Sequence, residues 1–173
     1  MKNKDSKYLT YLLRHKPEKE KLSMDKNGWV SVQELLTKLD ISKEDLNLIV
    51  LEDDKKRFEY NVDESKIRAC QGHSVKVDLG FKKTIPPVIL YHGSSNKFLT
   101  NVLKKGLLKM NRLHVHLSKD LDTAQIVGKR KGKDIIIYEV DTKSMHKDGF
   151  IFFLSSNGVW LTDNVPPRYI NKK

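Results

Sequence analysis

The chain has 173 residues, of which 38% are hydrophobic and 32% are charged. This length suits one domain or two small lobes with a hydrophobic core, and no stretch approaches the roughly 18 consecutive apolar residues that a membrane-spanning helix needs. The single cysteine, Cys70, excludes an internal disulfide and any all-cysteine metal site. Because the N-terminus is polar and unlike a signal peptide, we expect a soluble, cytoplasmic protein.

The net charge of +11 is the balance expected of a protein whose partner carries phosphate groups. The charge is uneven along the chain. Residues 1–80 hold 16 basic and 15 acidic side chains, whereas residues 81–173 hold 17 basic and 7 acidic ones. The second half therefore carries nearly all of the net positive charge.

A pair of adjacent prolines, Pro86 and Pro87, lies close to the change in charge. Successive prolines favour extended, irregular backbone and are typical of a linker. We therefore expect an α+β protein with two lobes, residues 1–80 and 88–173, joined by a linker at 81–87.

The first expected helix lies near the N-terminus, where Leu9 and Leu12 recur at helical spacing. It should end before Pro17, because the residue that precedes a proline avoids the helical region. Arg14 and His15 are therefore expected at the C-terminal end of this helix.

Two further helices and a β-hairpin are expected in the first lobe. The second helix extends to Leu39, and the third begins after Ser42 as its cap. Phe58–Tyr60 and Lys66–Ala69, separated by a polar turn, have the pattern of a hairpin. Three helices followed by a hairpin predict a winged-helix-like lobe.

A winged helix raises the hypothesis of a non-catalytic nucleic-acid-binding module whose third helix enters the major groove of DNA. From Ser42 to Asp54, however, the chain carries five acidic residues against a lone Lys43. A helix of that charge is repelled by a duplex whose binding depends on neutralised phosphates. We therefore rank this hypothesis last among the functions considered.

The second lobe is expected to open with the strand Val88–Tyr91, which delivers His92–Ser94 to a loop. A helix follows from about Ser95 and ends at Gly106. Beyond it, the pattern predicts a strand, a short helix, a buried strand and a hairpin with an Asn-Gly turn. These elements are Val115–Leu117, Asp120–Gly128, Ile135–Val140, and Phe150–Leu154 with Val159–Leu161. The second lobe is therefore mixed and mostly β.

The glycine motifs of common nucleotide sites do not occur in the sequence, which holds neither G-x-G-x-x-G nor G-x-x-x-x-G-K-[ST]. An ordinary Rossmann or P-loop site is therefore not expected. His114 and His116, on one strand face, come nearest to a metal pair, but a metal site needs three or four converging ligands. We expect a structural or substrate-facing pair and no bound metal.

Two H-x-S triplets, His92–Ser94 and His116–Ser118, raise a second enzymatic hypothesis. In a two-histidine RNA cyclic phosphodiesterase, one imidazole acts as the base and the other as the acid. Such a site leaves the arginines of the chain without a role, so this hypothesis remains an alternative.

Seven sequence blocks resemble the NAD-dependent RNA 2′-phosphotransferase family, in order and over essentially the whole chain. The blocks are Arg14–Glu18, Asn27–Val30, Lys66–Ser74, Leu90–Ser94, Arg112–Ser118, Val127–Arg130 and Ser156–Leu161. One block alone is a weak signal, but seven in register are a strong one. Two departures are small: Ser94 stands where many members carry threonine, and Cys70 stands where a polar residue is expected.

The resemblance implies a winged-helix-like N-terminal lobe and an ADP-ribosyltransferase-like C-terminal lobe, with NAD consumed as a co-substrate. In this family an internal 2′-phosphate of RNA attacks the nicotinamide ribose of NAD and expels nicotinamide. The ribose 2″-hydroxyl then attacks the phosphorus, which gives RNA with a free 2′-hydroxyl and ADP-ribose 1″,2″-cyclic phosphate. The implied partners are NAD and RNA with a 2′-phosphate, tRNA being one candidate; neither a membrane nor an obligate protein partner is indicated.

The family's catalytic Arg-His-Arg-Arg set falls on Arg14, His15, Arg68 and Arg130. Planar guanidinium groups suit this chemistry, because their paired hydrogen bonds stabilise the charge on a phosphoryl group while it is being transferred. Without the resemblance, more ordinary roles would be expected. The first two residues would interact with a helix C-terminus, and the other two would be solvated surface charges.

The resemblance also implies two sets of binding residues. The residues that match NAD-binding segments are His92, Gly93, Ser94, Arg112, His114, His116 and Ser118. The residues that would line the RNA phosphate pocket are Gln71, His73 and Ser74. Gly93 would let its backbone approach a ligand closely. Trp29 and Trp160 are flanked by alternating apolar residues, so we assign both to the hydrophobic core rather than to the site.

Overall fold

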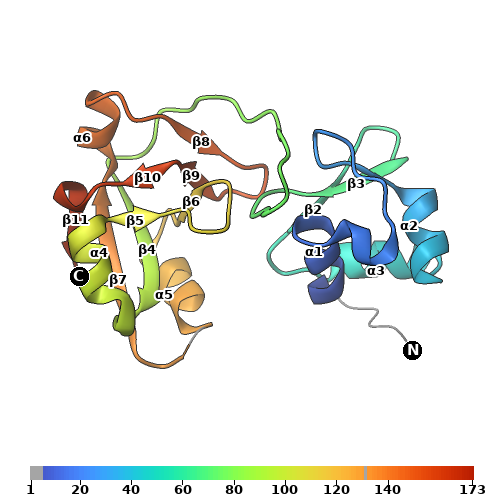
Figure 1. Ribbon diagram of the computed structural model, residues 1–173, viewed down its shortest axis with the longest axis horizontal. Helices are drawn as coiled ribbons and strands as arrows, with labels where there is room; N and C mark the ends of the chain where they lie inside the picture. The colour runs from blue at the N-terminus through green and yellow to red at the C-terminus, as the bar shows by residue number, and fades with distance from the viewer. Residues whose placement is uncertain (1–5, 131) are drawn as a thin grey trace. The chain divides into compact units, whose positions relative to one another are not determined.

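The structure is a computed structural model that describes residues 6–130 and 132–173 (Figure 1). The chain divides into two compact units between Gly80 and Phe81, called unit 1 and unit 2 here. Both units combine helices with small antiparallel sheets, which confirms the predicted α+β class. No helix in the described ranges is long and apolar enough to cross a membrane.

Unit 1 combines helices with a three-stranded antiparallel sheet in the order β1-β3-β2. Its helices are α1 (Ser6–Arg14), the 3-10 helix η1 (Pro17–Glu20), α2 (Val32–Leu39) and α3 (Lys43–Leu51). Its strands are β1 (Val30–Ser31), β2 (Phe58–Tyr60) and β3 (Lys66–Ala69). The predicted helices and hairpin are confirmed, and β1 is a strand that the sequence pattern did not indicate.

The core of unit 1 explains why its helices form where they do. Leu9, Leu12 and Leu13 of α1 are at most 2% exposed and share one hydrophobic cluster with Leu35 of α2 and Leu46 of α3. Removing such side chains from water is the main force that stabilises short helices in a protein. The apolar face of α1 thus fixes where its last residues point.

Local signals set the helix ends. α1 stops at Arg14, three residues before Pro17, as predicted. At the start of α3, the Ser42 hydroxyl accepts a hydrogen bond from the Asp45 N–H, and the Asp45 carboxylate accepts one from the Ser42 N–H. This reciprocal capping box supplies partners for backbone groups that the helix itself cannot satisfy.

Unit 2 is built on antiparallel sheets with the strand orders β11-β7-β4, β6-β9-β8 and β10-β5. Its strands are β4 (Ile89–Ser95), β5 (Leu107–Leu108), β6 (Val115–Leu117), β7 (Ile135–Asp141), β8 (Phe152–Leu154), β9 (Trp160–Thr162), β10 (Asn164–Val165) and β11 (Ile170–Lys172). Its helices are η2 (Asn96–Phe98), α4 (Leu99–Lys105), α5 (Leu121–Lys129), α6 (Thr142–Lys147) and η3 (Pro167–Tyr169). Trp160 is 6% exposed within the hydrophobic cluster of this unit, so its assignment to the core is confirmed.

The strand that opens unit 2 is longer than predicted. β4 continues through His92–Ser94 to Ser95, so the expectation that these residues form a loop is wrong. The reason is pairing: β4 matches β7 residue for residue along its whole length, and the hydrogen bonds of the ladder keep the polar segment extended. The following helix ends at Gly106 with φ +80, as its glycine predicted.

Candidate active-site residues

Arg14 is the last residue of α1, and its side chain is buried at 9% exposure. The segment that follows Cys70 wraps around it. A Cβ placed on Gly72, which has φ +89, would lie 3.2 Å from Cζ of Arg14, so the guanidinium packs directly on the Gly72 backbone. The N–H of Ser74 donates to the Arg14 carbonyl at 2.9 Å. Arg14 thus lies at the helix C-terminus, as the ordinary alternative expected, but its charge is buried.

His15 lies beside the same segment. Its Nδ1 is 3.0 Å from the hydroxyl oxygen of Ser74. The last turn of α1 and the Gln71–Ser74 segment are thus joined by both backbone and side-chain hydrogen bonds. Gln71 itself is half-buried, next to Gly72.

His73 is the most deeply buried polar residue of the group. It is 1% exposed, and neither ring nitrogen has a hydrogen-bond partner among the residues that the structure describes. Burial, followed by the positive charges of Arg14, His15 and Arg68, lowers the pKa of His73 to about 3. The ring is therefore neutral at physiological pH, and three of the four predicted catalytic residues lie close enough to act on it.

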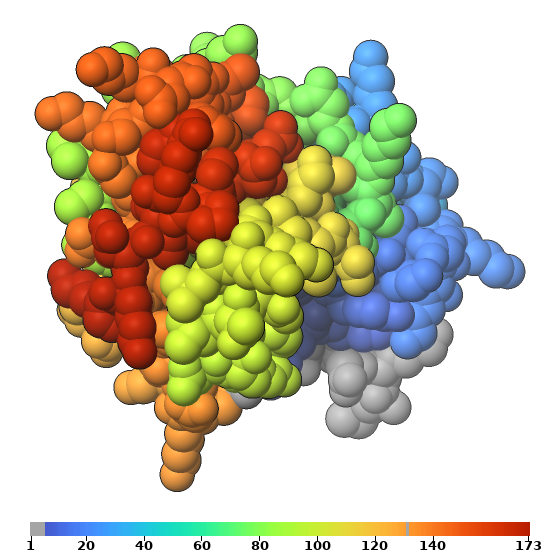
Figure 2. Space-filling model, turned by 60° about the vertical axis from the view of Figure 1, so that its left-hand side comes forward, coloured from blue at the N-terminus to red at the C-terminus, as the bar shows by residue number. Residues whose placement is uncertain are grey.

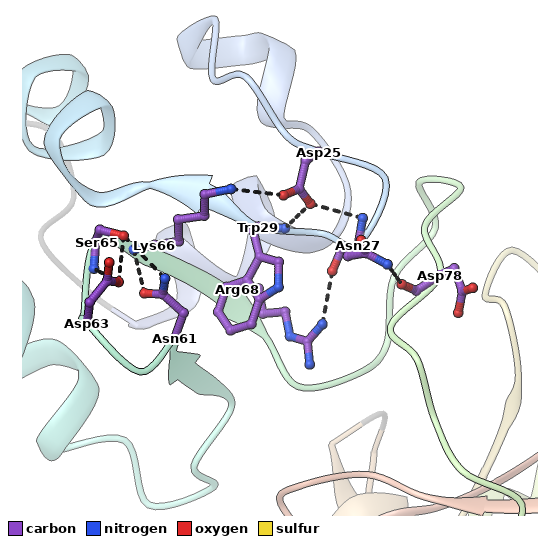
Figure 3. Close-up of polar contacts among 9 residues, drawn as sticks. All are labelled: Asp25, Asn27, Trp29, Asn61, Asp63, Ser65, Lys66, Arg68 and Asp78. Carbon is purple, nitrogen blue, oxygen red and sulfur yellow. Dashed lines mark hydrogen bonds and ion pairs between the residues drawn. The ribbon is translucent and has the colours of Figure 1, made fainter.

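Arg68 lies on β3, directly opposite Glu59 of β2. Its Nε donates to the Glu59 carboxylate at 2.6 Å, and its Nη1 donates to the carbonyl of Asn27 at 3.1 Å. The guanidinium carbon lies 4.2 Å from the ring centroid of Trp29, and Figure 3 shows the two side chains next to each other. With 17% of its side chain exposed, Arg68 is not the solvated surface charge of the ordinary alternative.

Trp29 and Glu59 are therefore site neighbours that the sequence did not reveal. Trp29 is half-buried and carries Arg68 on its ring, so its assignment to the core is wrong. Glu59 could have been found from the register of the predicted hairpin, since that register places it opposite Arg68.

In unit 2, backbone and side-chain contacts bring β4 and β6 together. Tyr91 and Ser118 exchange two backbone hydrogen bonds, at 2.9 and 2.7 Å. The His92 Nδ1–H donates to the carbonyl of His116 at 2.9 Å, and Arg112 Nη1 lies 3.5 Å from His116 Nδ1. The structure thus gathers His92, Arg112, His116 and Ser118, which are four of the seven predicted NAD-binding residues.

Two other members of that set lie on β4. Ser94 is half-buried and follows His92 by two residues, which places both on the same face of the strand. Gly93 faces α5: a Cβ there would lie 1.9 Å from the carbonyl oxygen of Ala124. Glycine is therefore required at position 93 because α5 packs on its backbone, a reason that the sequence alone did not show.

His114, the remaining member of the set, packs against two aromatic rings. Its ring makes edge contacts with Phe81 and Phe153, with centroids 6.1 and 5.6 Å apart. Burial lowers the pKa of His114. Across the two described ranges, no group of three or more His, Cys, Asp or Glu residues is arranged to hold a metal ion.

Arg130 lies immediately after α5, where its N–H donates to the Val127 carbonyl at 3.3 Å. Its side chain is exposed. The four residues of the predicted catalytic set therefore come from both units, three from unit 1 and Arg130 from unit 2.

Comparison with known proteins decides the family. A model described as "RNA 2'-phosphotransferase, Tpt1 / KptA family" matches residues 2–164. The chain belongs to this family. It is 50% identical over 173 residues to a probable RNA 2′-phosphotransferase of Flavobacterium johnsoniae, an alignment that covers 97% of this chain and 94% of that protein. A second probable RNA 2′-phosphotransferase, from Fusobacterium nucleatum, is 47% identical over 169 residues, which cover 95% of this chain and 94% of that protein.

As a member of the RNA 2′-phosphotransferase family, the chain is a transferase that passes the 2′-phosphate of RNA to NAD. The family, the activity and the co-substrate that the seven sequence blocks implied are confirmed. The DNA-binding module and the two-histidine phosphodiesterase are therefore set aside.

Proposed function

We propose that unit 1 is a winged-helix-like lobe that holds the 2′-phosphate of RNA, and that residues 88–173 of unit 2 form an ADP-ribosyltransferase-like, NAD-binding lobe joined to it by residues 81–87. The observation that carries the phosphate-binding assignment is the cluster around the buried His73, where the Arg14 guanidinium packs on Gly72 and His15 Nδ1 lies 3.0 Å from the Ser74 hydroxyl. The charges of Arg14, His15 and Arg68 all act on the His73 ring. A concentration of partly buried positive charge favours a phosphate dianion as its ligand.

Within unit 1, Arg14 and Arg68 bind the phosphate oxygens with permanently charged guanidinium groups. His15 and Ser74, 3.0 Å apart, complete the pocket with an imidazole and a hydroxyl, and Gln71 adds an amide. Because His73 is neutral, its buried ring lies among Arg14, His15 and Arg68 without adding to the repulsion among these cations. The pocket thus recognises a phosphate through donors that are already held in place.

The residues gathered in unit 2 suit NAD, whose pyrophosphate and ribose groups need a cation and several hydrogen-bonding partners. Arg112 supplies the cation, Ser94 and Ser118 supply hydroxyls, and His92 and His116 supply imidazoles. The proton of His92 is on Nδ1, where it is bonded to the His116 carbonyl, so Nε2 of a neutral ring is the acceptor. Gly93 and His114 support this face through packing on α5 and on the two phenylalanines.

In the reaction, NAD supplies an electrophilic ribose carbon and nicotinamide as the leaving group. Unit 1 holds the 2′-phosphate oxygen that attacks this carbon. In the second step, the 2″-hydroxyl attacks the phosphorus and the bond to the RNA 2′-oxygen breaks. The family resemblance gives Arg14, His15, Arg68 and Arg130 the role of stabilising the charge that develops on the phosphoryl oxygens.

The test of the proposed function uses RNA with a single internal 2′-phosphate, incubated with the protein with and without NAD. We expect release of nicotinamide, loss of the 2′-phosphate and formation of ADP-ribose 1″,2″-cyclic phosphate only when RNA phosphate and NAD are both present. RNA of the same sequence with a 2′-hydroxyl is the control and should release no nicotinamide. Dephosphorylation that proceeds equally well without NAD would contradict the proposal.

RNA binding should depend on salt with a modest slope, because a pocket for one 2′-phosphate neutralises few phosphates. Exposed lysines on unit 2 add to this attraction. The segment that carries α4 covers part of the surface seen in Figure 2, and its Lys104 and Lys105 are exposed. Titration of labelled RNA at several salt concentrations measures the slope. Tight binding to duplex DNA of one particular sequence would contradict the assignment.

We propose that the physiological substrate is an RNA with an internal 2′-phosphate, for which tRNA is one candidate. A cytoplasmic location agrees with the single cysteine of the sequence, Cys70, which is buried and forms no disulfide.

A further inference from the structure

Arg68 is held on three sides before any substrate is present. Glu59 accepts a hydrogen bond from Nε, the Asn27 carbonyl accepts one from Nη1, and the Trp29 ring lies under the guanidinium plane. Among the residues that the structure describes, these are the only hydrogen-bond acceptors of Arg68. Its Nη2 is therefore left to donate to a ligand.

The Asn27 carbonyl and the Trp29 ring are themselves fixed by one turn. Asp25 Oδ1 accepts hydrogen bonds from the N–H groups of Asn27 and Trp29, at 2.9 and 3.0 Å. The Asn27 side chain donates to the Asp78 carbonyl at 2.7 Å, which ties the turn to the end of unit 1. Figure 3 shows this set of hydrogen bonds, with the turn above Arg68.

We propose that Trp29 and Glu59 are positioning residues that hold Arg68 with its Nη2 directed to the RNA phosphate. This inference rests on the proposed function, in which Arg68 contacts that phosphate. An arginine side chain free in solution samples many rotamers, and each must be lost when it binds. A guanidinium that is stacked and bonded in advance loses little on binding, and the stacking leaves its edge available to a phosphate.

The two positioning residues have different tasks. Trp29 blocks one face of the guanidinium and so fixes its plane, which sets the direction of the two N–H bonds on Nη2. Glu59 fixes rotation within that plane through Nε. The pair thus orients Arg68 without touching the phosphate, and a misplacement of about 1 Å at such a group can cost about 100-fold in rate.

The test measures the two chemical steps separately in Trp29→Leu, with single-turnover assays on labelled 2′-phospho-RNA. We expect the second step to slow about 30-fold and the Michaelis constant for NAD to change less than about twofold. Trp29→Phe keeps an aromatic face and should stay within about threefold of the unmodified protein. Tyr60→Leu is the matched control, because it removes a ring that lies 4.1 Å from the Nζ of Lys43, a cation without a role in the reaction.

The variant Arg68→Ala distinguishes the role of Arg68 in the reaction from the positioning role of Trp29. In the Arg68→Ala background, Trp29→Leu should change the second step less than about twofold, because the residue it acts through is gone. If Arg68→Ala alone leaves the second step unchanged, the proposed function of Arg68 is wrong. If Arg68→Ala slows that step but Trp29→Leu behaves like Tyr60→Leu, or if the two substitutions are independent, the positioning role is wrong.

Glu59 keeps the inference testable if Trp29→Leu does not fold. Glu59→Gln retains an acceptor for Nε and should stay within about threefold of the unmodified protein. Glu59→Ala removes the acceptor and should slow the second step about tenfold with an unchanged Michaelis constant for NAD. Equal rates for these two variants in single-turnover assays would overturn the positioning role.

Discussion

Replacing Arg68 or Arg130 by alanine is expected to slow the second chemical step by about 10²–10³-fold and the first step much less. In the first step, the RNA phosphate is already an anion, so the arginines serve mainly to place it. In the second step, they must stabilise charge that develops only in the transition state. RNA that carries ADP-ribose on its 2′-phosphate should therefore accumulate.

Single-turnover assays with labelled 2′-phospho-RNA resolve substrate, intermediate and product. His15→Ala should show the same accumulation, because its imidazole belongs to the same phosphate pocket. Arg168, an exposed arginine of η3 that is bonded to Tyr169, offers a matched control: Arg168→Ala should show neither defect. If the Arg68 and Arg130 variants lose both steps in equal proportion and no intermediate builds up, the arginines serve RNA binding alone.

The elements of unit 1 could be predicted from the sequence because their signals are local. Leucines at helical spacing, Pro17 after α1, the Ser42 cap and the polar turn of the hairpin each act within a few residues. The helices and the hairpin strands accordingly lie where they were expected. The strand β1 was missed because it has only two residues and both pair with β3, far along the chain.

The length of β4 could not be predicted for a related reason. Polar residues and a glycine at 92–94 are typical of a loop when only neighbours in the sequence are considered. In the fold, β7 offers a partner strand for all seven residues of β4, and α5 packs on the bare backbone of Gly93. Pairing and packing between distant segments therefore override the local preference.

In the candidate site too, the sequence identified residues but not the contacts that they make with distant segments. The resemblance to a family supplied Arg14, His15, Arg68 and Arg130 as residues, but not the surroundings that give each its chemistry. Gly72 lies against Arg14, and Trp29 stacks on Arg68, through contacts between residues 39 or more positions apart. Glu59 contacts Arg68 because of the strand register. The burial of His73 was equally invisible, because its neighbours in the sequence are small or polar.

That burial predicts a loss of stability in unit 1 as the pH falls. The pKa of His73 is about 3 in the folded protein and about 6.5 in an unfolded chain. Between these two pKa values, His73 is protonated in the unfolded state but not in the folded state. The free energy of unfolding therefore falls as the pH drops from about 6.5 toward 3. Between pH 7.5 and pH 5, this group alone should lower the free energy of unfolding by about 2 kcal/mol.

His73→Gln removes the titrating group while keeping a polar side chain of similar length, so this share of the pH dependence should vanish. Urea unfolding followed through the amide NMR signals of residues 6–80 measures unit 1 by itself, and the comparison of interest is the change between pH 7.5 and pH 5 in each protein. His146→Gln, at an exposed histidine of α6 in unit 2, is the control and should behave like the unmodified chain. If His73→Gln loses as much stability as the unmodified chain over this range, the ring already carries a proton in the folded state at pH 5. His73 would then be a further cation beside Arg14, His15 and Arg68 rather than the neutral ring that lets these three lie together.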